Sequence, residues 1–312
     1  MIDSIFIVCV VMLNILGLVI YDLVRYGRFL VDSIMTIPLP VDSYLESDTA
    51  GERVSFESLD GSELQGKLIK SDRNTGKTVI FCHEYGKSMN SWERYTSFLP
   101  KHGFNVLTLN FRSTSNINGD EASPSSKQWP SSLEYEDLMG AIHYLRSRPD
   151  LAANMIALFG ISKGGGVAIY TASRSPEVKA VIVDGMYSMI ELILTYAYRL
   201  APVLIPKYVY AVLPKKIMFY FYATAILRVY GWKAGYNFLH VEGALQKNKN
   251  PVFFIHGEQD AYFRVKQVKM LFDRACGHKV FWTVGGAKHN EGVCVNPVEY
   301  EQRVVRFLEK YT

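Results

Sequence analysis

Cysteine is scarce in this chain, and its scarcity excludes a small fold held together by disulfides. The four cysteines are Cys9, Cys82, Cys276 and Cys294. Cys9 lies in an apolar N-terminal run and the other three are irregularly spaced, so neither a disulfide framework nor a zinc site is predicted. A single bond between Cys276 and Cys294 stays open. The chain also has no Asn-x-Ser/Thr glycosylation acceptor, and these absences together favour a reducing compartment.

Charge gives no reason to expect a nucleic-acid partner. The net charge is only +4, and no basic stripe is interleaved with aromatic residues in the way that nucleic-acid-binding proteins show. The sequence also lacks a cluster of metal-ligand residues, an internal repeat and a low-complexity segment, so neither a metal nor a cofactor is expected. What the chain has is size and apolar content. Its 312 residues, 49% of them hydrophobic, predict one α/β domain with an insertion.

Residues 5–21 form an uncharged apolar run near the N-terminus. In a helix this run spans about 26 Å, slightly less than the ~30 Å core of a bilayer, and an extension to Val24 supplies the difference. A cleaved signal peptide is the competing interpretation, but the first four residues lack Lys and Arg and no small-x-small site follows the run. A buried helix is disfavoured because the run has no polar face. We therefore predict a single-pass transmembrane anchor at residues 1–24. Arg25 and Arg28 favour a catalytic domain on the cytoplasmic side, and the other side stays open.

Short apolar strands alternate with helices along most of the remaining chain. An antiparallel hairpin comes first, over residues 53–70. Buried strands are then predicted at residues 78–82, 105–109, 155–159, 178–183, 252–256 and 279–284. Helices are predicted at residues 91–101, 131–148, 164–174, 264–275 and 297–310, the second opened by a capping box from Ser131 to Glu134. Repeated βα units predict a mostly parallel central sheet with helices on both faces.

The segment Gly160-Ile161-Ser162-Lys163-Gly164 lies between a buried strand and a helix. In this G-x-S-x-G pattern the turn is too tight for a side chain two residues either side of the serine, and the serine takes a strained conformation that exposes its hydroxyl. The backbone N–H of Lys163 then lies at a helix N-terminus, where it could stabilise an oxyanion. The pattern alone is common, and a Gly-rich turn without chemistry is the alternative.

Two later strand ends supply what this serine needs as a nucleophile. Asp260 follows strand 252–256 and His289 follows strand 279–284, so both leave the carboxyl edge of the sheet that presents Ser162. The order Ser, Asp, His is the one that this turn motif predicts. An imidazole with a pKa near ~6.5 can take and return the serine proton, and a carboxylate can orient the imidazole. Asp184, after strand 178–183, is an alternative acid.

A second oxyanion donor is expected from the loop after strand 78–82. This loop reads His83-Glu84-Tyr85-Gly86, and the backbone N–H of Tyr85 is the predicted donor. His83 precedes the serine in the chain, which is the wrong order for the base. It is therefore interpreted as a hydrogen-bonding residue that shapes the loop.

Residues 186–245 interrupt the βα alternation and are predicted to form a helical cap over the carboxyl edge of the sheet. Pro202, Pro206 and Pro214 are expected to divide the cap into short helices, and six basic minus two acidic side chains give it a charge of +4. Its aromatic faces could line an acyl pocket or rest on a bilayer surface, or the insertion could serve stability alone. The other domains are a linker at 25–50 and a core in two parts, 51–185 and 246–312.

With these motifs in place, the chain resembles the α/β-hydrolase superfamily over about residues 51–312, most closely a membrane-anchored bacterial branch of esterase- and lipase-like serine hydrolases. The segments that carry the resemblance are residues 81–86, 110–112, 128–129, 158–165, 183–185, 256–260 and 287–290. The resemblance implies acyl transfer through an acyl-serine, with Ser162, His289 and Asp260 as a catalytic triad. One departure is Glu84, because many members have glycine after the histidine, and this residue bears on the geometry of the oxyanion loop.

The sequence thus predicts a membrane-bound serine hydrolase that cleaves a small-molecule ester or thioester with an apolar acyl group. Its predicted membrane contact is the N-terminal helix, and contact through the cap is an open alternative. An acyltransferase or a peptidase would use the same triad, because fold does not fix the substrate. A non-catalytic binding protein of the same fold is the third alternative. The oligomeric state is not predicted.

Overall fold

The structure is a computed structural model that describes residues 51–73, 75–112, 129–151 and 155–312. Before residue 51 it describes only Phe6, Val10, Asn14, Gly17, Tyr21 and Arg25. The predicted anchor at 1–24 and the linker at 25–50 therefore lie almost entirely outside the described residues. Within the part of the chain that is described, none of the helices is both long enough and apolar enough to cross a membrane.

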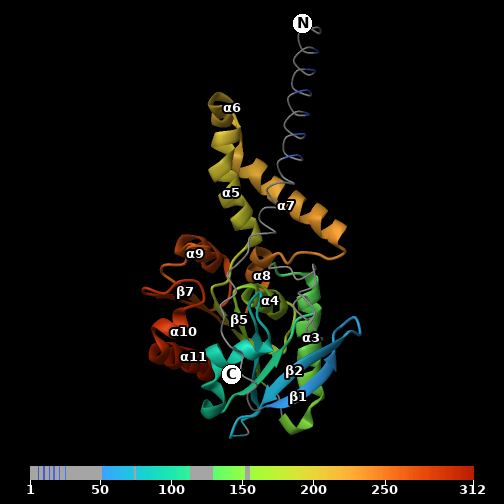
Figure 1. Cartoon of the computed structure of the whole chain (residues 1–312), viewed down its shortest axis with the longest axis vertical. Helices are drawn as coiled ribbons and strands as arrows, with labels where there is room; N and C mark the ends of the chain where they lie inside the picture. Colours follow the sequence, from blue (N-terminus) through green and yellow to red (C-terminus); the bar gives the residue numbers. More distant parts are fainter. Residues whose placement is uncertain are drawn as a thin grey trace.

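An eight-stranded sheet forms the centre of the molecule, with the strand order β1-β2-β4-β3-β5-β6-β7-β8 (Figure 1). The strands are β1 (Glu52–Glu57), β2 (Glu63–Ile69), β3 (Lys77–Cys82), β4 (Asn105–Leu109), β5 (Met155–Ile161), β6 (Val178–Asp184), β7 (Val252–Gly257) and β8 (Lys279–Val284). β1 pairs antiparallel with β2, and β2 antiparallel with β4. All other neighbours are parallel. The predicted hairpin and mostly parallel sheet are confirmed.

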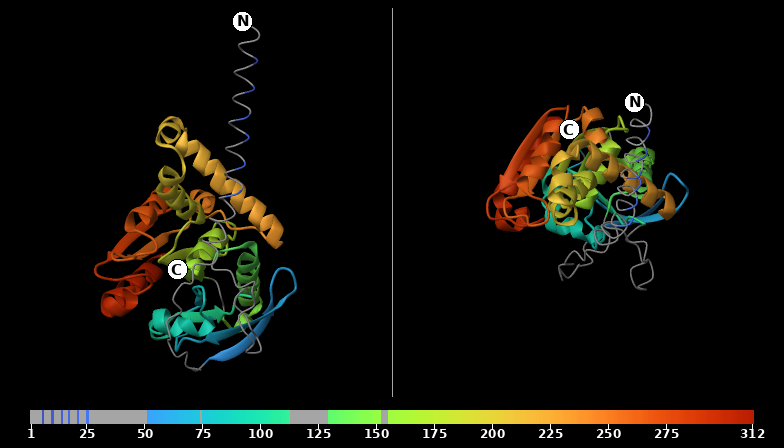
Figure 2. Two further views of the ribbon diagram at one scale, coloured as in Figure 1. Left: turned by 45° about the horizontal axis from the view of Figure 1, so that its top comes forward. Right: turned by 90° about the horizontal axis from the view of Figure 1, so that it is seen from above.

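Helices cover both faces of the sheet, as predicted (Figure 2). On one face lie α3 (Ser132–Ser147), α4 (Lys163–Ala172), α8 (Val241–Lys247) and α9 (Val265–Arg274), whose apolar residues join one core cluster. On the other face, α2 (Trp92–Thr96), α10 (Gly292–Val295) and α11 (Pro297–Tyr311) join a second cluster. Because both faces are covered, the central strands are apolar on both sides, and β4 is buried at every residue.

The helix predicted at residues 91–101 is wrong as a single element. The structure has three short pieces here: a 3₁₀ turn at Met89–Ser91, α2, and a second 3₁₀ turn at Leu99–His102. Pro100 is the physical reason, because proline has no N–H to donate to the carbonyl four residues earlier, so the α-helical hydrogen-bond pattern stops before it. Trp92, Tyr95 and Leu99 are all buried. The apolar spacing therefore marks the buried residues correctly, although they do not lie on one continuous helix.

The cap helices α5 (Met189–Leu204), α6 (Lys207–Val212) and α7 (Lys215–Ala234) project away from the sheet, with α6 at the far end (Figure 1). Pro206 and Pro214 precede α6 and α7 as expected, but Pro202 lies inside α5 and does not divide it. Proline is tolerated there because it stands in the last turn, where its missing N–H removes only one hydrogen bond of the helix. The cap is therefore built from longer helices than predicted.

The chain leaves the cap along the start of α3. Ser131 bridges to Phe238, the backbone N–H of Ser132 donates to the carbonyl of Asn237 at 2.7 Å, and Leu239 donates to Pro130 at 3.0 Å. The predicted capping box opens α3, since Glu134 Oε2 accepts the backbone N–H of Ser131 at 2.9 Å. The cap is thus tied to the helix whose first turn lies beside the G-x-S-x-G motif.

Candidate active site

Ser162 stands on a strained turn between β5 and α4. Its φ of 50° and ψ of −112° are rare for a residue with a side chain. The two motif glycines make the turn possible. A Cβ at Gly160 would lie 2.4 Å from the carbonyl oxygen of Gly164, and a Cβ at Gly164 would lie 2.1 Å from that of Cys82. The predicted strained turn with obligatory glycines is confirmed.

The structure brings Ser162, His289 and Asp260 together at the carboxyl edge of the sheet. Ser162 Oγ lies 3.0 Å from His289 Nε2, and His289 Nδ1 lies 2.6 Å from Asp260 Oδ2. Because the carboxylate accepts the Nδ1 proton, Nε2 is left to accept the serine hydroxyl, as a general base must. The three residues come from three separate loops, and their order along the hydrogen bonds is the predicted one.

Asp260 is held so that one oxygen faces the histidine. Its Oδ1 accepts the backbone N–H groups of Tyr262 at 2.8 Å and Phe263 at 2.9 Å, which leaves Oδ2 for His289. Burial by itself raises the pKa of this carboxyl, but the hydrogen bond and charge of His289 and the N–H of Phe263 outweigh it. The net result is a pKa below the ordinary range. Asp260 is therefore an anion at neutral pH.

A second imidazole fixes the turn that carries Asp260. His256, the fifth residue of β7, is fully buried, and its Nε2 donates to the carbonyl of Phe263 at 2.6 Å. Burial lowers the pKa of His256 despite the nearby Asp260 carboxylate. A neutral His256 therefore braces the Asp260–Phe263 turn without competing as a cation for the carboxylate. The sequence motif contained this histidine, but nothing in it indicated the partner.

Gly185 makes room for the histidine loop. Its φ is 64°, and a Cβ on it would lie 2.4 Å from Asn290 Oδ1 and 3.1 Å from His289 Cε1. Asn290 itself has a positive φ of 59°, a conformation that asparagine tolerates better than most residues. Two unusual backbone positions thus allow His289 to reach over β6 to the serine.

Asp184, the alternative acid, is bonded elsewhere. Its Oδ2 accepts the hydroxyl of Tyr300 at 2.8 Å, and its backbone carbonyl accepts the N–H of Ser162 at 2.7 Å. Burial raises the pKa of this carboxyl to about 7, against the lowering effect of Tyr300. A carboxyl that is half protonated near neutrality cannot orient the imidazole as Asp260 does. The geometry therefore favours Asp260 over Asp184.

The loop after β3 is shaped by His83, as predicted. His83 Nε2 accepts the backbone N–H of Phe111 at 3.3 Å, so its Nδ1 carries the proton and donates to the carbonyl of Glu84 at 2.7 Å. The Glu84 carboxyl is buried and accepts the hydroxyls of Ser91 and Tyr95. It thus turns toward α2, and burial raises its pKa. Tyr85, next in the loop, stays the predicted oxyanion donor.

Lys163 has a second role that the sequence did not show. Its side chain is buried, and its Nζ lies 2.5 Å from Glu134 Oε1. Since Glu134 also caps α3, this ion pair joins the residue after the nucleophile to the start of α3. A buried pair of this kind is costly to break from one side. The backbone N–H of Lys163, at the first position of α4, stays a predicted oxyanion donor.

Aromatic rings form a row that ends at the catalytic histidine. Trp129 meets Tyr187 edge-on at 5.5 Å, Tyr187 stacks on Phe263 at 4.2 Å, and Phe263 lies 5.6 Å from His289. Trp129, Tyr187 and Phe263 are each at most 5% exposed. The surroundings of the triad on this side are therefore apolar, which strengthens the electrostatic interactions within it.

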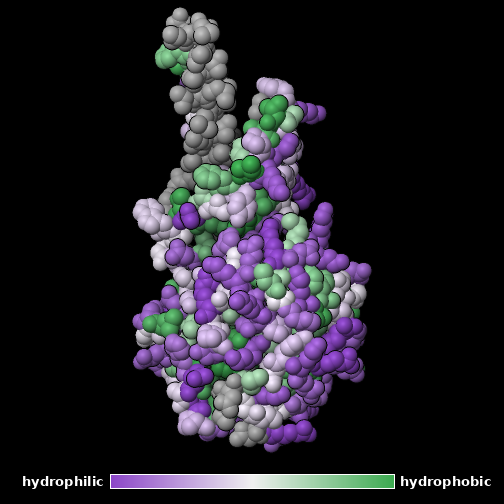
Figure 3. Space-filling model, turned by 180° about the vertical axis from the view of Figure 1, so that it is seen from behind, coloured by the Kyte–Doolittle hydropathy of each residue, from purple (hydrophilic) through white to green (hydrophobic). Residues whose placement is uncertain are grey.

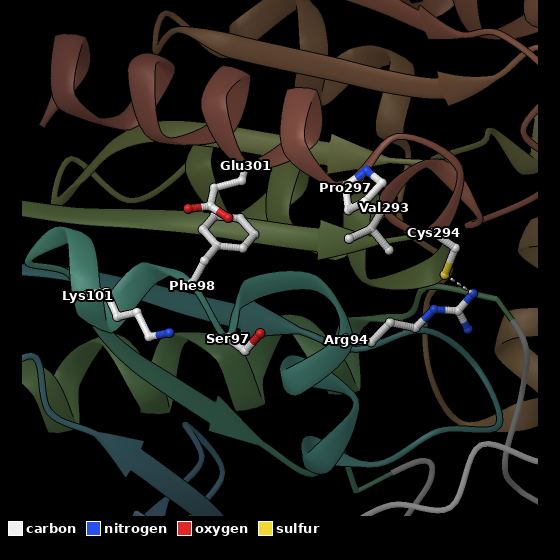
Figure 4. A pocket seen from close by; sticks show the side chains of 8 residues that line it. All are labelled: Arg94, Ser97, Phe98, Lys101, Val293, Cys294, Pro297 and Glu301. Carbon is white, nitrogen blue, oxygen red and sulfur yellow. Dashed lines mark hydrogen bonds between the residues drawn. The ribbon is translucent and has the colours of Figure 1, made fainter.

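A separate cleft of about 430 Å³ lies between α2 and the 3₁₀ turn Leu99–His102 on one side and α10 and α11 on the other (Figure 4). It contains none of the triad residues. Arg94 donates to Cys294 Sγ at 3.3 Å at one end of the cleft.

Cys294 and Cys276 are both free thiols, so the structure has no disulfide bond between them. Among the residues that the structure describes, no cluster of His, Cys, Asp and Glu side chains could hold a metal ion.

Comparison with known proteins identifies the fold. A family model described as BAAT / Acyl-CoA thioester hydrolase C terminal matches residues 132–273, a range that includes Ser162 and Asp260 and ends before His289. The Pyrococcus furiosus esterase Pf2001 aligns with a TM-score of 0.61 at 22% identity, covering 89% of this chain and 97% of that one. Dienelactone hydrolase from Anabaena variabilis aligns with a TM-score of 0.54 at 19% identity, over 84% and 99%. The chain has the α/β-hydrolase fold.

The first curated relatives match only part of the chain. The uncharacterized protein YfhR of Escherichia coli (strain K12) is 30% identical over 146 residues, which are 45% of this chain and 48% of that protein. The chain thus spans about half the length of the first curated relatives it matches.

Proposed function

We propose that the protein is a serine hydrolase that cleaves a carboxylic ester or thioester bond, with Ser162 as nucleophile, His289 as base and Asp260 as its orienting acid. The observation that carries the proposal is the pair of hydrogen bonds from Ser162 to His289 and from His289 to Asp260. The strained backbone of Ser162 supports it, because such strain is typical of functional sites. The match to an acyl-CoA thioester hydrolase family model agrees with the reaction class.

The reaction follows from the positions of the protons. Nε2 of His289 takes the Ser162 proton as Oγ attacks the carbonyl carbon, and the oxyanion is stabilised by the backbone N–H groups of Lys163 and Tyr85. The imidazolium is stabilised by Asp260 and gives its proton to the leaving alcohol or thiol, so the acyl group stays on Ser162. Water then attacks the acyl-serine with the same base, and the carboxylic acid leaves.

An apolar acyl group is the substrate part that best suits the surroundings of the triad. The row of Trp129, Tyr187 and Phe263 lies beside His289, and α5 of the cap begins directly after it at Met189. Buried aromatic side chains provide favourable contacts for hydrocarbon and few for a sugar or a charged peptide. This preference favours an acyl ester or thioester over a peptide.

A panel of esters and thioesters of graded acyl length tests the proposal. The full chain, in detergent micelles, is expected to hydrolyse p-nitrophenyl esters or acyl thioesters with a rate that changes about tenfold or more across the series, since each CH₂ buried contributes about 0.8 kcal/mol. Product analysis with a competing alcohol or amine separates a hydrolase from an acyltransferase, and an acyl-amide substrate tests the peptidase alternative. Hydrolysis at the background rate for every acyl length would contradict the proposal and favour the alternative of a non-catalytic binding protein.

We also propose that the chain is bound to a membrane by residues 1–24, with the catalytic domain in the cytoplasm. The support is the uncharged run at 5–21 followed by Arg25 and Arg28. The intact chain is expected to stay in the membrane fraction through washes with 1 M salt, whereas a variant without residues 1–24 is expected in the soluble fraction after the same wash. An intact chain that the salt wash alone releases would contradict the anchor.

A further inference from the structure

The far end of the cap exposes large apolar side chains. Val203 at the end of α5, Tyr208 and Val212 on α6, and Ile217 and Phe221 at the start of α7 are 80%, 77%, 81%, 75% and 74% exposed. We call these residues the cap tip. Figure 3 shows hydrophobic residues on the cap helices above a body that is mostly hydrophilic. Isolated apolar residues on a surface need no explanation, but a group on neighbouring elements marks an interaction site.

The cap tip is not needed for the packing of the cap itself. The inner faces of the cap helices have their own small core, in which Ala197, Ala201 and Phe219 are buried. In α7, Phe219 and Ala223 face inward while Ile217 and Phe221 face outward. A helix that is apolar on both its inner and its outer face is expected to be covered on both. Within the described part of the chain nothing covers the outer face, so this face fits a partner.

The charge of the cap indicates which kind of partner fits the cap tip. From residue 192 to residue 241 the chain has no Asp or Glu, whereas Lys207, Lys215 and Lys216 lie among the residues of the cap tip. The two acidic residues that flank this stretch in the sequence are both buried and have partners. Glu191 forms an ion pair with Arg274 at 3.1 Å, and Glu242 accepts the hydroxyl of Ser188. A second copy of this chain would bring the same positive charge and be repelled. An anionic lipid surface is complementary, since it accepts apolar side chains and attracts lysines.

We propose that the cap tip is an interfacial lipid-binding surface, with α6 and the adjoining ends of α5 and α7 lying in the headgroup region of an anionic membrane. Lysine stems can lie along the apolar surface while their charges reach the headgroups. α5 leads from this surface to Met189, which follows the aromatic row beside His289, over about 24 Å of helix. This geometry would deliver a membrane-dissolved acyl substrate to the triad, a consequence that rests on the proposed function. The proposed contact between the cap tip and the membrane does not depend on the proposed function.

Hydrogen–deuterium exchange on the full chain tests the contact. We use the Ser162→Ala protein, so that the result is independent of catalysis, and compare nanodiscs of anionic lipid with nanodiscs of zwitterionic lipid. Amides of residues 207–212 and 215–222 are expected to exchange about tenfold more slowly on the anionic lipid, because the attraction of the lysines to anionic headgroups holds these helices at the surface. The double variant Lys207→Glu/Lys216→Glu is expected to lose this difference.

The matched control carries the same change in net charge away from the cap tip. Lys249 and Lys266 are exposed, and Lys249→Glu/Lys266→Glu is expected to keep the wild-type protection. A second variant, Ile217→Ser/Phe221→Ser, changes only exposed side chains and is expected to exchange faster than wild type on both lipids. Equal exchange on the two lipids would overturn the proposal. So would protection that appears without lipid as the protein concentration rises, because a second copy would then be the partner.

Discussion

Replacement of Ser162 by alanine is expected to lower kcat/KM for an ester or thioester by about 10⁴- to 10⁶-fold, because the acyl-serine can no longer form. The residual rate would come from the oxyanion donors and from substrate binding alone. Stability is expected to change by no more than about 1 kcal/mol, since the hydroxyl makes a single hydrogen bond to His289 and alanine keeps the same Cβ on the strained backbone.

The measurement combines turnover with covalent labelling by a fluorophosphonate. Intact mass should show one adduct on the wild-type chain and none on Ser162→Ala, while circular dichroism and the thermal midpoint stay close to wild type. Ser173→Ala is a matched control at the other end of α4, where the hydroxyl donates to the carbonyl of Tyr170 at 2.8 Å. It should label normally. An adduct on Ser162→Ala at the wild-type rate would show that another residue is the nucleophile.

The parts of this fold that the sequence predicted are those with a local cause. The strands from β3 to β8 are short apolar runs between turns, and the G-x-S-x-G motif carries its own steric reason, since a Cβ at Gly160 or Gly164 would collide with backbone atoms. The carboxyl ends of parallel strands lie at one edge of a sheet, so the strand order along the chain was sufficient to place Asp260 and His289 near Ser162.

The parts that the sequence could not predict depend on contacts between distant elements. Lys163 and Glu134 form a buried ion pair between α4 and α3, and neither residue carries a local sign of the other. The break before Pro100 was missed because the apolar spacing of a helix continues through it. Pro202 was expected to end a helix, but in the last turn of α5 it costs one hydrogen bond, which packing can offset.

The two carboxyls nearest the triad differ in the direction of their pKa shifts, and this difference assigns their states. Asp260 has a pKa below its ordinary range because His289 and backbone N–H groups favour its charged form. For Asp184, burial outweighs the hydroxyl of Tyr300 and the charge of His289, and its pKa rises to about 7. Carboxyls whose environments move their pKa values apart take different roles. Asp260 is available as an anion, and Asp184 is a group that burial destabilises once it is charged.

Replacement of Asp184 by asparagine is therefore expected to stabilise the protein at high pH. In the folded state the Asp184 carboxyl keeps its proton up to a pH of about 7, whereas in the unfolded chain it loses the proton near its ordinary pKa of 3.8. Between these values the folded state binds more protons, so the free energy of unfolding falls as the pH rises. The loss amounts to about 4 kcal/mol by pH 8, at 1.36 kcal/mol for each pKa unit. Asparagine can still accept the Tyr300 hydroxyl and has no charge to bury.

Urea or thermal unfolding at pH 5 and pH 8 measures this effect. The Asp184→Asn variant should exceed wild type by about 2 kcal/mol at pH 5 and by about 4 kcal/mol at pH 8, because the wild-type loss begins once the pH passes 3.8. Glu84, whose pKa burial also raises, adds a slope of the same sign to both the wild type and the variant. Asp72→Asn, at an exposed position, should keep the full wild-type slope. If Asp184→Asn is less stable than wild type at pH 8, the carboxylate must be stabilised there by a group beyond Tyr300. Asp184 would then again compete with Asp260 as the acid that supports His289.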